Sequence, residues 1–332
     1  MKQLYIIGNG FDIHHGIPSQ YSNYCKWLGE NDANLIERLR NFYNVDDKKW
    51  WSQFELELGY PDMSEYIEEV AFENQPDYGS DSFRDRDYHA GQIAAEDEIG
   101  ALITDIKGTF KDWISSLPSP IDDKKIKIDR NDAFFINFNY TNTLQKVYNI
   151  KPTDILFIHG NATNDKDLVL GHNRSYDEIN AEFSPELPEP PEDLEDNELA
   201  EWYDENFDCG EDYIHQSVRD EVVSQICRLR KDTQNIIKAN QISFEALKNT
   251  EIIHIYGLSF SPVDMPYLDE IANKVDLSTV KWNVSYYSDE DKKQAQHYFN
   301  KKGINDILVK YIKLVDLLLI KQAEFQFERN KK

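Results

Sequence analysis

The sequence predicts an α/β protein with a doubly wound parallel sheet, helical insertions and an acidic insert. Two observations support this prediction. Short apolar runs bounded by Gly, Asn, Asp or Pro alternate along the chain with segments of helical period. The apolar runs are continuous, which indicates strands covered on both faces, as in parallel sheets. The 332 residues are enough for one large domain or two ordinary ones.

The predicted strands are short apolar runs that end in turn-forming residues. Five are clear and a sixth is weaker. In chain order they are residues 3–7, 133–138, 155–159, 251–256, 282–287 and, as the weaker one, 306–312.

Helical periodicity fills most of the remaining chain. In residues 32–43, Leu35, Ile36 and Leu39 share one helical face. Ser19 is a suitable N-cap for a helix that begins there. The predicted helices are residues 19–30, 32–43, 63–72, 94–117, 222–247 and 289–302.

These elements predict a core that two insertions interrupt. The α/β core is expected to comprise residues 1–28, 131–174 and 250–332. Residues 29–130 form a helical insertion, and residues 175–249 form an acidic loop followed by a second helical insertion.

The net charge of −25 is concentrated in one segment. Residues 175–218 hold sixteen Asp and Glu and no Lys or Arg, which leaves −9 for the rest of the chain. Such a run is usually a solvated loop. The alternatives with a specific function are a lid over a binding site and a mimic of nucleic-acid charge.

The overall negative charge argues against binding of duplex nucleic acid or of an anionic membrane surface. The 13% aromatic content excludes a disordered acidic chain.

Several features are not found in the sequence. No apolar run reaches the ~18 residues of a membrane-spanning helix, and the N-terminus does not resemble a signal peptide. Cys25, Cys209 and Cys227 are too widely spaced for a disulfide framework or a zinc site. We therefore expect a cytoplasmic protein without a bound metal.

A basic patch at Arg228, Arg230 and Lys231 is expected to face a phosphate or the acidic insert.

The first candidate motif follows the first predicted strand, in the run Gly8-Asn9-Gly10-Phe11-Asp12. Gly-x-Gly between a strand and a helix allows the backbone to approach a pyrophosphate, with helix amides facing the charge. The third glycine of the dinucleotide fingerprint is missing, because Ile13 occupies its position. A simple strand-to-helix turn is the alternative interpretation.

Two further motifs follow the second and third predicted strands. Asn139, Tyr140 and Thr141 end the first of these, and His159 ends the other. Polar groups past the carboxyl ends of parallel strands face the ligand crevice of open α/β sheets, and a histidine there can act as a base near neutral pH. An Asn-rich helix cap and a hydrogen-bonded loop histidine are the structural alternatives.

The fourth motif is Gly257-Leu258-Ser259, with Asp264 five residues after the serine. Small residues at a strand end let a nucleotide come close. The motif is not a hydrolase elbow, because Gly-x-Ser-x-Gly would need glycine at Ser261. Each of the four signals is weak alone, but their order along the chain is the one a nucleotide crevice requires.

Together these motifs resemble the AbiH family of bacterial abortive-infection proteins. The resemblance runs from residue 6 to about residue 267 and does not include the acidic insert. It rests on Gly8 to Asp12, Gly16-Ile17-Pro18-Ser19-Gln20-Tyr21, Trp51-x-x-Phe54-Glu55, the Asn139 run, His159-Gly160-Asn161 and Gly257-x-Ser259 with Asp264.

The same motifs are distantly similar to sirtuin-like NAD-binding proteins, which implies a Rossmann-like NAD-binding fold. Asp12 stands where that family has serine, Thr141 stands where it has an Asp, and Ser19 and Tyr21 replace its Asp and Arg. The zinc cysteines are missing, so protein deacetylation is not implied. By this resemblance Asn139 and His159 are catalytic. The residues that it assigns to NAD binding are Gly8, Asn9, Gly10, Phe11, Asp12, Pro18, Tyr140, Thr141, Gly257, Ser259 and Asp264.

Two functions of different class follow from these resemblances. The first is an anti-phage effector that binds NAD or a related nucleotide and hydrolyses it with release of nicotinamide. The second is a non-catalytic nucleotide-binding sensor that acts through a partner. For either function we expect a phage protein or a defence-system component as trigger, and assembly into a homo-oligomer.

Overall fold

The computed structural model describes residues 2–77, 79, 81, 83–163, 168–184, 199, 202 and 213–319. Most of the acidic insert, residues 185–212 apart from 199 and 202, lies outside the described residues. Its proposed roles as loop, lid or mimic therefore stay predictions.

Six parallel strands form a single sheet in the order β3-β2-β1-β4-β5-β6. This is the order of the Rossmann fold, in which the strand order reverses beside the first strand. The predicted α/β class with a Rossmann-like sheet is confirmed. The strands are β1 (Gln3–Ile7), β2 (Ala133–Asn137), β3 (Ile155–Phe157), β4 (Ile252–Tyr256), β5 (Lys281–Ser285) and β6 (Val309–Ile312).

The register of the central strand places the predicted motifs at one edge of the sheet. Ile7, the last residue of β1, lies opposite Asn137 on β2 and Tyr256 on β4. The chain then leaves β1, β2 and β4 on the same side, because parallel strands end at a common edge. The reversal of strand order falls between β1 and β4, where ligands of open α/β sheets bind.

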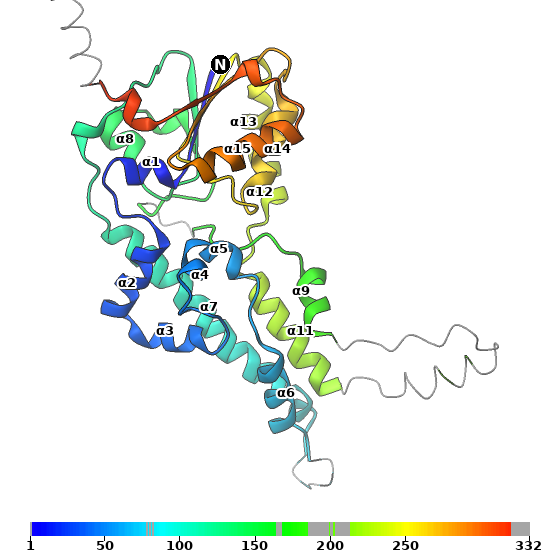
Figure 1. Ribbon diagram of the computed structural model, residues 1–332. Helices are drawn as coiled ribbons and strands as arrows, with labels where there is room; N and C mark the ends of the chain where they lie inside the picture. Colours follow the sequence, from blue (N-terminus) through cyan, green and yellow to red (C-terminus); the bar gives the residue numbers. More distant parts are fainter. Residues whose placement is uncertain are drawn as a thin grey trace, which may run out of the picture.

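Both faces of the sheet are buried, as the continuous apolar strands predict. Side chains alternate along β1, so Leu4 and Ile6 pack on one face while Tyr5 and Ile7 pack on the other. The first face is covered by α13 (Gln241–Glu245), α14 (Met265–Lys274) and α15 (Asp289–Lys301), and the second by α1 (Asn9–His14) and α8 (Thr143–Tyr148). Figure 1 shows these helices around the sheet in the upper part of the molecule.

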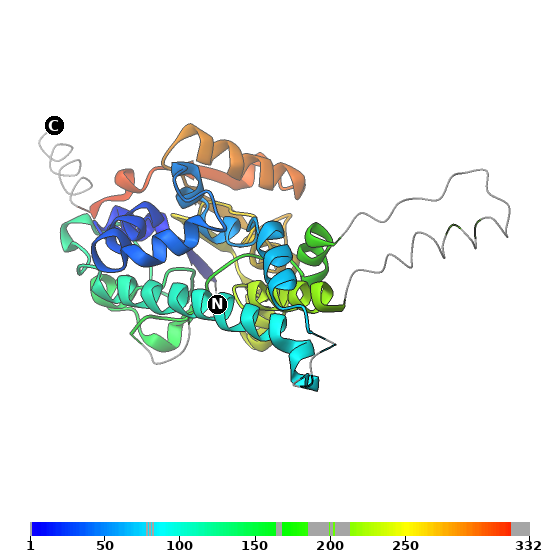
Figure 2. The same cartoon turned by 90° about the horizontal axis from the view of Figure 1, so that it is seen from below.

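Most of the remaining helices pack together beneath the carboxyl edge of the sheet and form the helical layer (Figure 1). The long helix α7 runs beside α11, as both views show (Figure 2). The layer consists of α2 (Tyr21–Asn31), α3 (Ala33–Arg40), α4 (Lys48–Ser52), α5 (Phe54–Glu57), α6 (Ser64–Glu73), α7 (Ala90–Ser116), α9 (Tyr176–Phe183) and α11 (Tyr213–Cys227).

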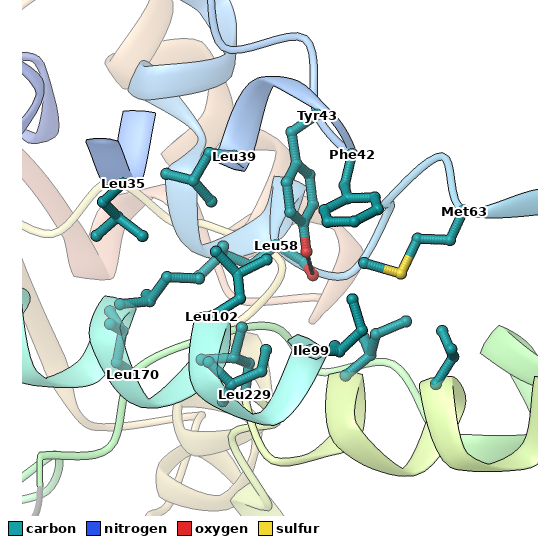
Figure 3. Packing of buried hydrophobic residues seen from close by; sticks show 14 of the residues in the cluster. Leu35, Leu39, Phe42, Tyr43, Leu58, Met63, Ile99, Leu102, Leu170 and Leu229 are labelled. Carbon is teal, nitrogen blue, oxygen red and sulfur yellow. Dashed lines mark hydrogen bonds between the residues drawn. The ribbon is translucent and has the colours of Figure 1, made fainter. Parts of the chain in front are cut away.

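Apolar side chains from distant parts of the chain form the core of the helical layer. Figure 3 shows Leu35 and Leu39 of α3 facing Ile99 and Leu102 of α7, with Leu229 close by. Burying a side chain of this size contributes roughly 1.5–3 kcal/mol. The layer therefore has a hydrophobic core of its own, separate from the two clusters on the faces of the sheet.

One predicted helix is wrong. The periodic stretch 222–247 is not continuous, because α11 ends at Cys227 and α12 (Thr233–Ala239) begins after Asp232, whose carboxylate caps it. The residues between them pair with another segment. His172 N–H donates to the Leu229 carbonyl at 2.9 Å, and Lys231 N–H donates to the His172 carbonyl at 2.6 Å. This pairing replaces helical hydrogen bonds with tertiary ones.

The predicted division into core and insertions stays a prediction, and the packing adds detail to it. Tyr24 and Leu28, placed in the first core segment, lie in the core of the helical layer. Phe244 and Leu247, placed in the second insertion, pack against the sheet. Among the described residues, no helix is long and apolar enough to cross a membrane.

A prediction concerns the glycine at the end of β4. Gly257 has φ +73°, and a Cβ placed on it would lie 2.1 Å from the Phe11 nitrogen. Gly257→Ala should therefore lower the free energy of unfolding by at least about 2 kcal/mol, from backbone strain and overlap. The matched control is Gly29→Ala in α2, where nothing lies within 4 Å of the added Cβ and alanine gains about 0.5–1 kcal/mol. Urea unfolding of both variants checks the expectation, and equal stabilities would contradict it.

Candidate functional site

The four predicted motifs meet at the carboxyl edge of the sheet. The Asn139 side chain donates to the Gly8 carbonyl at 3.0 Å, and the Gly10 N–H donates to the Gly257 carbonyl at 2.8 Å. His159 Nε2 lies 3.7 Å from Asp264 Oδ1. Residues more than a hundred positions apart in the sequence are therefore direct neighbours. The functional roles assigned to them stay predictions.

The first motif packs closely against the fourth. A Cβ on Gly8 would lie 2.7 Å from the Gly257 carbonyl oxygen, and one on Gly10 would lie 2.9 Å from the Gly257 Cα. The Gly8 N–H donates to the Tyr256 carbonyl, so the amides of Gly8 and Gly10 are both bonded within the fold. In this structure the two glycines let the β1 and β4 loops touch, and their own N–H groups do not face a ligand.

Asn9 is held by the loop that precedes α2. Its amide donates to the Ser19 carbonyl at 2.9 Å, and the Ser19 hydroxyl donates to its side-chain oxygen. Ser19 is therefore not the N-cap of α2, which begins after Gln20 without a side-chain cap. Pro18 and Ser259, which were also assigned to the ligand, are exposed. Phe11 is fully buried.

Asp12 lies at the base of the site. Its carboxylate is 1% exposed and accepts hydrogen bonds from Thr141 at 2.5 Å and Thr143 at 2.7 Å. Burial raises the pKa of Asp12 to about 6, against the opposing effect of these hydrogen bonds. Thr141 thus bonds to an acid supplied by α1.

His159 carries an unpartnered ring nitrogen. Its side chain is 1% exposed, and Nδ1 lies 3.3 Å from the Phe138 carbonyl, which assigns the proton to Nδ1. Nε2 has no hydrogen-bond partner among the described residues. Burial first, and then the charge of Lys231, hold the pKa of His159 well below its usual value. The imidazole is neutral at pH 7, with a free electron pair on Nε2.

A buried lysine lies next to this histidine. The Lys231 ammonium is 2.9 Å from the Glu55 carboxylate and 3.4 Å from Asp264 Oδ1, and the Lys231 side chain is 1% exposed. We call these three side chains the buried ion cluster. Burial disfavours the charged lysine, but the attraction of Asp264 and Glu55 is larger and raises the pKa of Lys231. Burial raises the pKa of Asp264 to about 6.

Two tyrosines border the buried ion cluster. The Tyr140 hydroxyl lies 2.9 Å from Glu55 Oε1 and 2.8 Å from the Val169 carbonyl. Burial and the charge of Glu55 raise the pKa of both Tyr21 and Tyr140 well above the usual value, so both hydroxyls are neutral.

Sequence reasoning did not assign Glu55 or Lys231 to the site. Glu55 belongs to the Trp51-x-x-Phe54-Glu55 motif, which was a signal for it. The expectation that Lys231 faces a phosphate or the acidic insert is wrong, because its ammonium is buried between two carboxylates. Within the described part of the chain, no group of three or more His, Cys, Asp or Glu is placed to hold a metal ion.

Comparison with known proteins identifies the family. The family model described as bacteriophage abortive infection AbiH matches residues 4–286. The chain belongs to the AbiH family. The match covers most of the chain and includes all four motifs and the buried ion cluster, so the predicted AbiH resemblance is confirmed. This AbiH protein thus has a role in bacteriophage abortive infection. Neither a curated protein nor a solved structure matches the chain.

A second prediction concerns the buried carboxyl of Asp12 in this AbiH protein. Because its pKa rises from 3.8 to about 6 on folding, the folded state binds its proton more tightly than the unfolded chain. Its stabilising contribution is complete below pH 4 and is lost as the pH rises through 6. The loss amounts to about 3 kcal/mol. Asp12→Asn should remove this part of the pH dependence of the free energy of unfolding.

Urea unfolding between pH 4 and pH 7 measures this effect. Asp97→Asn is the control, because Asp97 is exposed on α7 and its replacement should leave the wild-type pH profile unchanged. If Asp12→Asn has the same pH profile as Asp97→Asn, Asp12 does not bind its proton more tightly in the folded state.

Proposed function

We propose that this AbiH protein is an anti-phage effector that binds NAD or a related nucleotide at the carboxyl edge of the sheet and hydrolyses it to release nicotinamide. The observation that supports this most directly is that Asn139 bonds to Gly8 and His159 lies beside Asp264, near the reversal of strand order, with His159 Nε2 buried and unpartnered among the described residues. Dinucleotides bind at this reversal in Rossmann folds. The similarity of the same motifs to sirtuin-like proteins supports NAD as the ligand.

The reaction breaks the bond between ribose C1′ and the nicotinamide nitrogen. The bonding electron pair leaves with nicotinamide and neutralises its positive ring, and water forms the new bond to C1′. Neutral His159 accepts the proton of that water at Nε2. Asn139 orients the water or a ribose hydroxyl through its carboxamide. The products are nicotinamide, ADP-ribose and a proton.

Substrate entry requires the strand-end loops to open. Asn139 and His159 are 5% and 1% exposed, and the Asn139 amide is bonded to the Gly8 carbonyl. Opening frees this amide. A phage protein, a defence-system partner or assembly into a homo-oligomer is the proposed trigger, and the proposed setting is the cytoplasm.

The second candidate function is a non-catalytic nucleotide sensor. The observation that favours it is that the positions that depart from the sirtuin pattern are bonded within the fold. Thr141 donates to Asp12, and Ser19 donates to Asn9. Tight binding of ADP-ribose without nicotinamide release would support the sensor over the hydrolase.

A third prediction tests the hydrolase directly. Purified protein is incubated with NAD, and nicotinamide release is followed in oligomeric fractions and in the presence of infected-cell lysate. His159→Ala should lower kcat by about 10²–10⁴-fold, the usual contribution of a general base, and Asn139→Ala should also lower it. His297→Ala and Asn300→Ala, both exposed on α15, are the matched controls and should keep wild-type rates. No release by the wild type under any of these conditions, or equal rates in all four variants, would overturn the proposal.

A further inference from the structure

We infer that Glu55 and Asp264 form an anionic wall that selects a positively charged N-ribosyl substrate, and that Lys231 is the positioning residue that fixes both carboxylates. This inference rests on the proposed hydrolysis of NAD and extends it. It gives roles to Glu55 and Lys231, and it defines the substrate class by the charge of the leaving group.

The buried ion cluster is assembled from three separate segments. Glu55 comes from α5 in the helical layer, Lys231 from the connection between α11 and α12, and Asp264 from the N-cap of α14. The side chains of Glu55, Lys231 and Asp264 are only 14%, 1% and 11% exposed. Burying three ionisable groups is costly unless they are paired. The neighbouring His159 Nε2, unpartnered among the described residues, marks this cluster as more than an isolated ion pair.

The net charge of the cluster is negative. Two carboxylates face one ammonium, while the bordering His159, Tyr21 and Tyr140 are neutral at pH 7. One negative charge is therefore not balanced within this group. In a buried site such a charge interacts much more strongly with a ligand cation than it would in water. The cluster therefore favours a positively charged group over a neutral group of the same shape.

NAD carries such a charge at the bond that breaks. The oxidised nicotinamide ring is positive, and as the bond to C1′ stretches, the positive charge moves from the ring onto the ribose. Carboxylates beside a cation-like ribosyl transition state stabilise it, as they do in glycoside hydrolysis. Reduced NADH has a neutral ring of nearly the same size, so it lacks the charge that the wall recognises.

Lys231 acts on the carboxylates and not on the substrate. Its raised pKa keeps it protonated, so it has no free electron pair with which to attack C1′. Its ammonium reaches both carboxylates, and its backbone is fixed by the hydrogen bond from its N–H to the His172 carbonyl. The lysine thus holds Glu55 and Asp264 at fixed positions relative to His159.

Glu55→Gln removes the charge of the wall while the hydrogen bonds can be kept. In the variant, the glutamine oxygen accepts from the Lys231 ammonium. The Tyr140 hydroxyl, which already lies 2.8 Å from the Val169 carbonyl, donates there and accepts from the glutamine amide. The variant should therefore fold, with a melting temperature close to that of the wild type. Glu57→Gln on the same short helix α5 is the matched control.

The test measures turnover of NAD and selectivity between NAD and NADH. Glu55→Gln should lower kcat by about tenfold or more, which corresponds to roughly 1.4 kcal/mol of transition-state stabilisation. In a His159→Ala background, in which turnover is strongly slowed, the preference for binding NAD over NADH should fall by about tenfold when Glu55→Gln is added. Asp264→Asn removes the same charge from the other side and should shift the selectivity in the same direction. Glu57→Gln should change neither quantity.

The outcomes separate this inference from the proposed function. If the wild type neither binds nor cleaves NAD, the proposed function fails, and the inference fails with it. If the wild type cleaves NAD but folded Glu55→Gln and Asp264→Asn keep its kcat and its selectivity, only the inference is overturned. In that case the buried ion cluster merely holds the helical layer against the sheet.

Discussion

A buried ammonium group needs nearby negative charge, and in this protein that requirement joins the two layers of the fold. Lys231 is buried at the carboxyl edge of the sheet and finds one carboxylate in the helical layer, at Glu55, and one at the start of α14, at Asp264. Without both carboxylates the buried ammonium would be uncompensated, and an uncompensated buried charge typically costs about 3–5 kcal/mol. The position of α5 against the sheet and the negative character of the site follow from this arrangement, and the charge of Lys231 adds to burial in keeping His159 neutral.

The edge where the layers meet is also the place where a Rossmann sheet binds its ligands. The strand order reverses between β1 and β4, and the loops that follow them touch through Gly8, Gly10 and Gly257. Polar groups there are largely bonded to one another, as Asp12 is to Thr141 and Thr143. The structure thus combines the topology of a nucleotide-binding protein with a closed edge whose main unpartnered polar atom, among the described site residues, is His159 Nε2.

Much of the fold could be predicted because strand signals are local. All six strands form where apolar runs end in turn residues, although several are shorter than expected, and β3 ends before His159. The helix predicted over residues 222–247 failed because periodicity cannot reveal a pairing partner. Leu229 and Lys231 bond to His172, which lies more than fifty positions earlier in the sequence. That break is also what places the Lys231 side chain in the site, so the missed turn and the missed residue have one cause.

By itself, the sequence determined the α/β class, the AbiH family and the four motifs at strand ends, because each of these depends on short runs of neighbouring residues. Parallel strands must end at a common edge, so the convergence of Asn139, His159 and Asp264 could be expected. The tertiary structure alone decided that the amides of Gly8 and Gly10 bond to the β4 segment and that Lys231 lies between Glu55 and Asp264. Burial and the distance between charges set these features, and both depend on how the helical layer packs against the sheet.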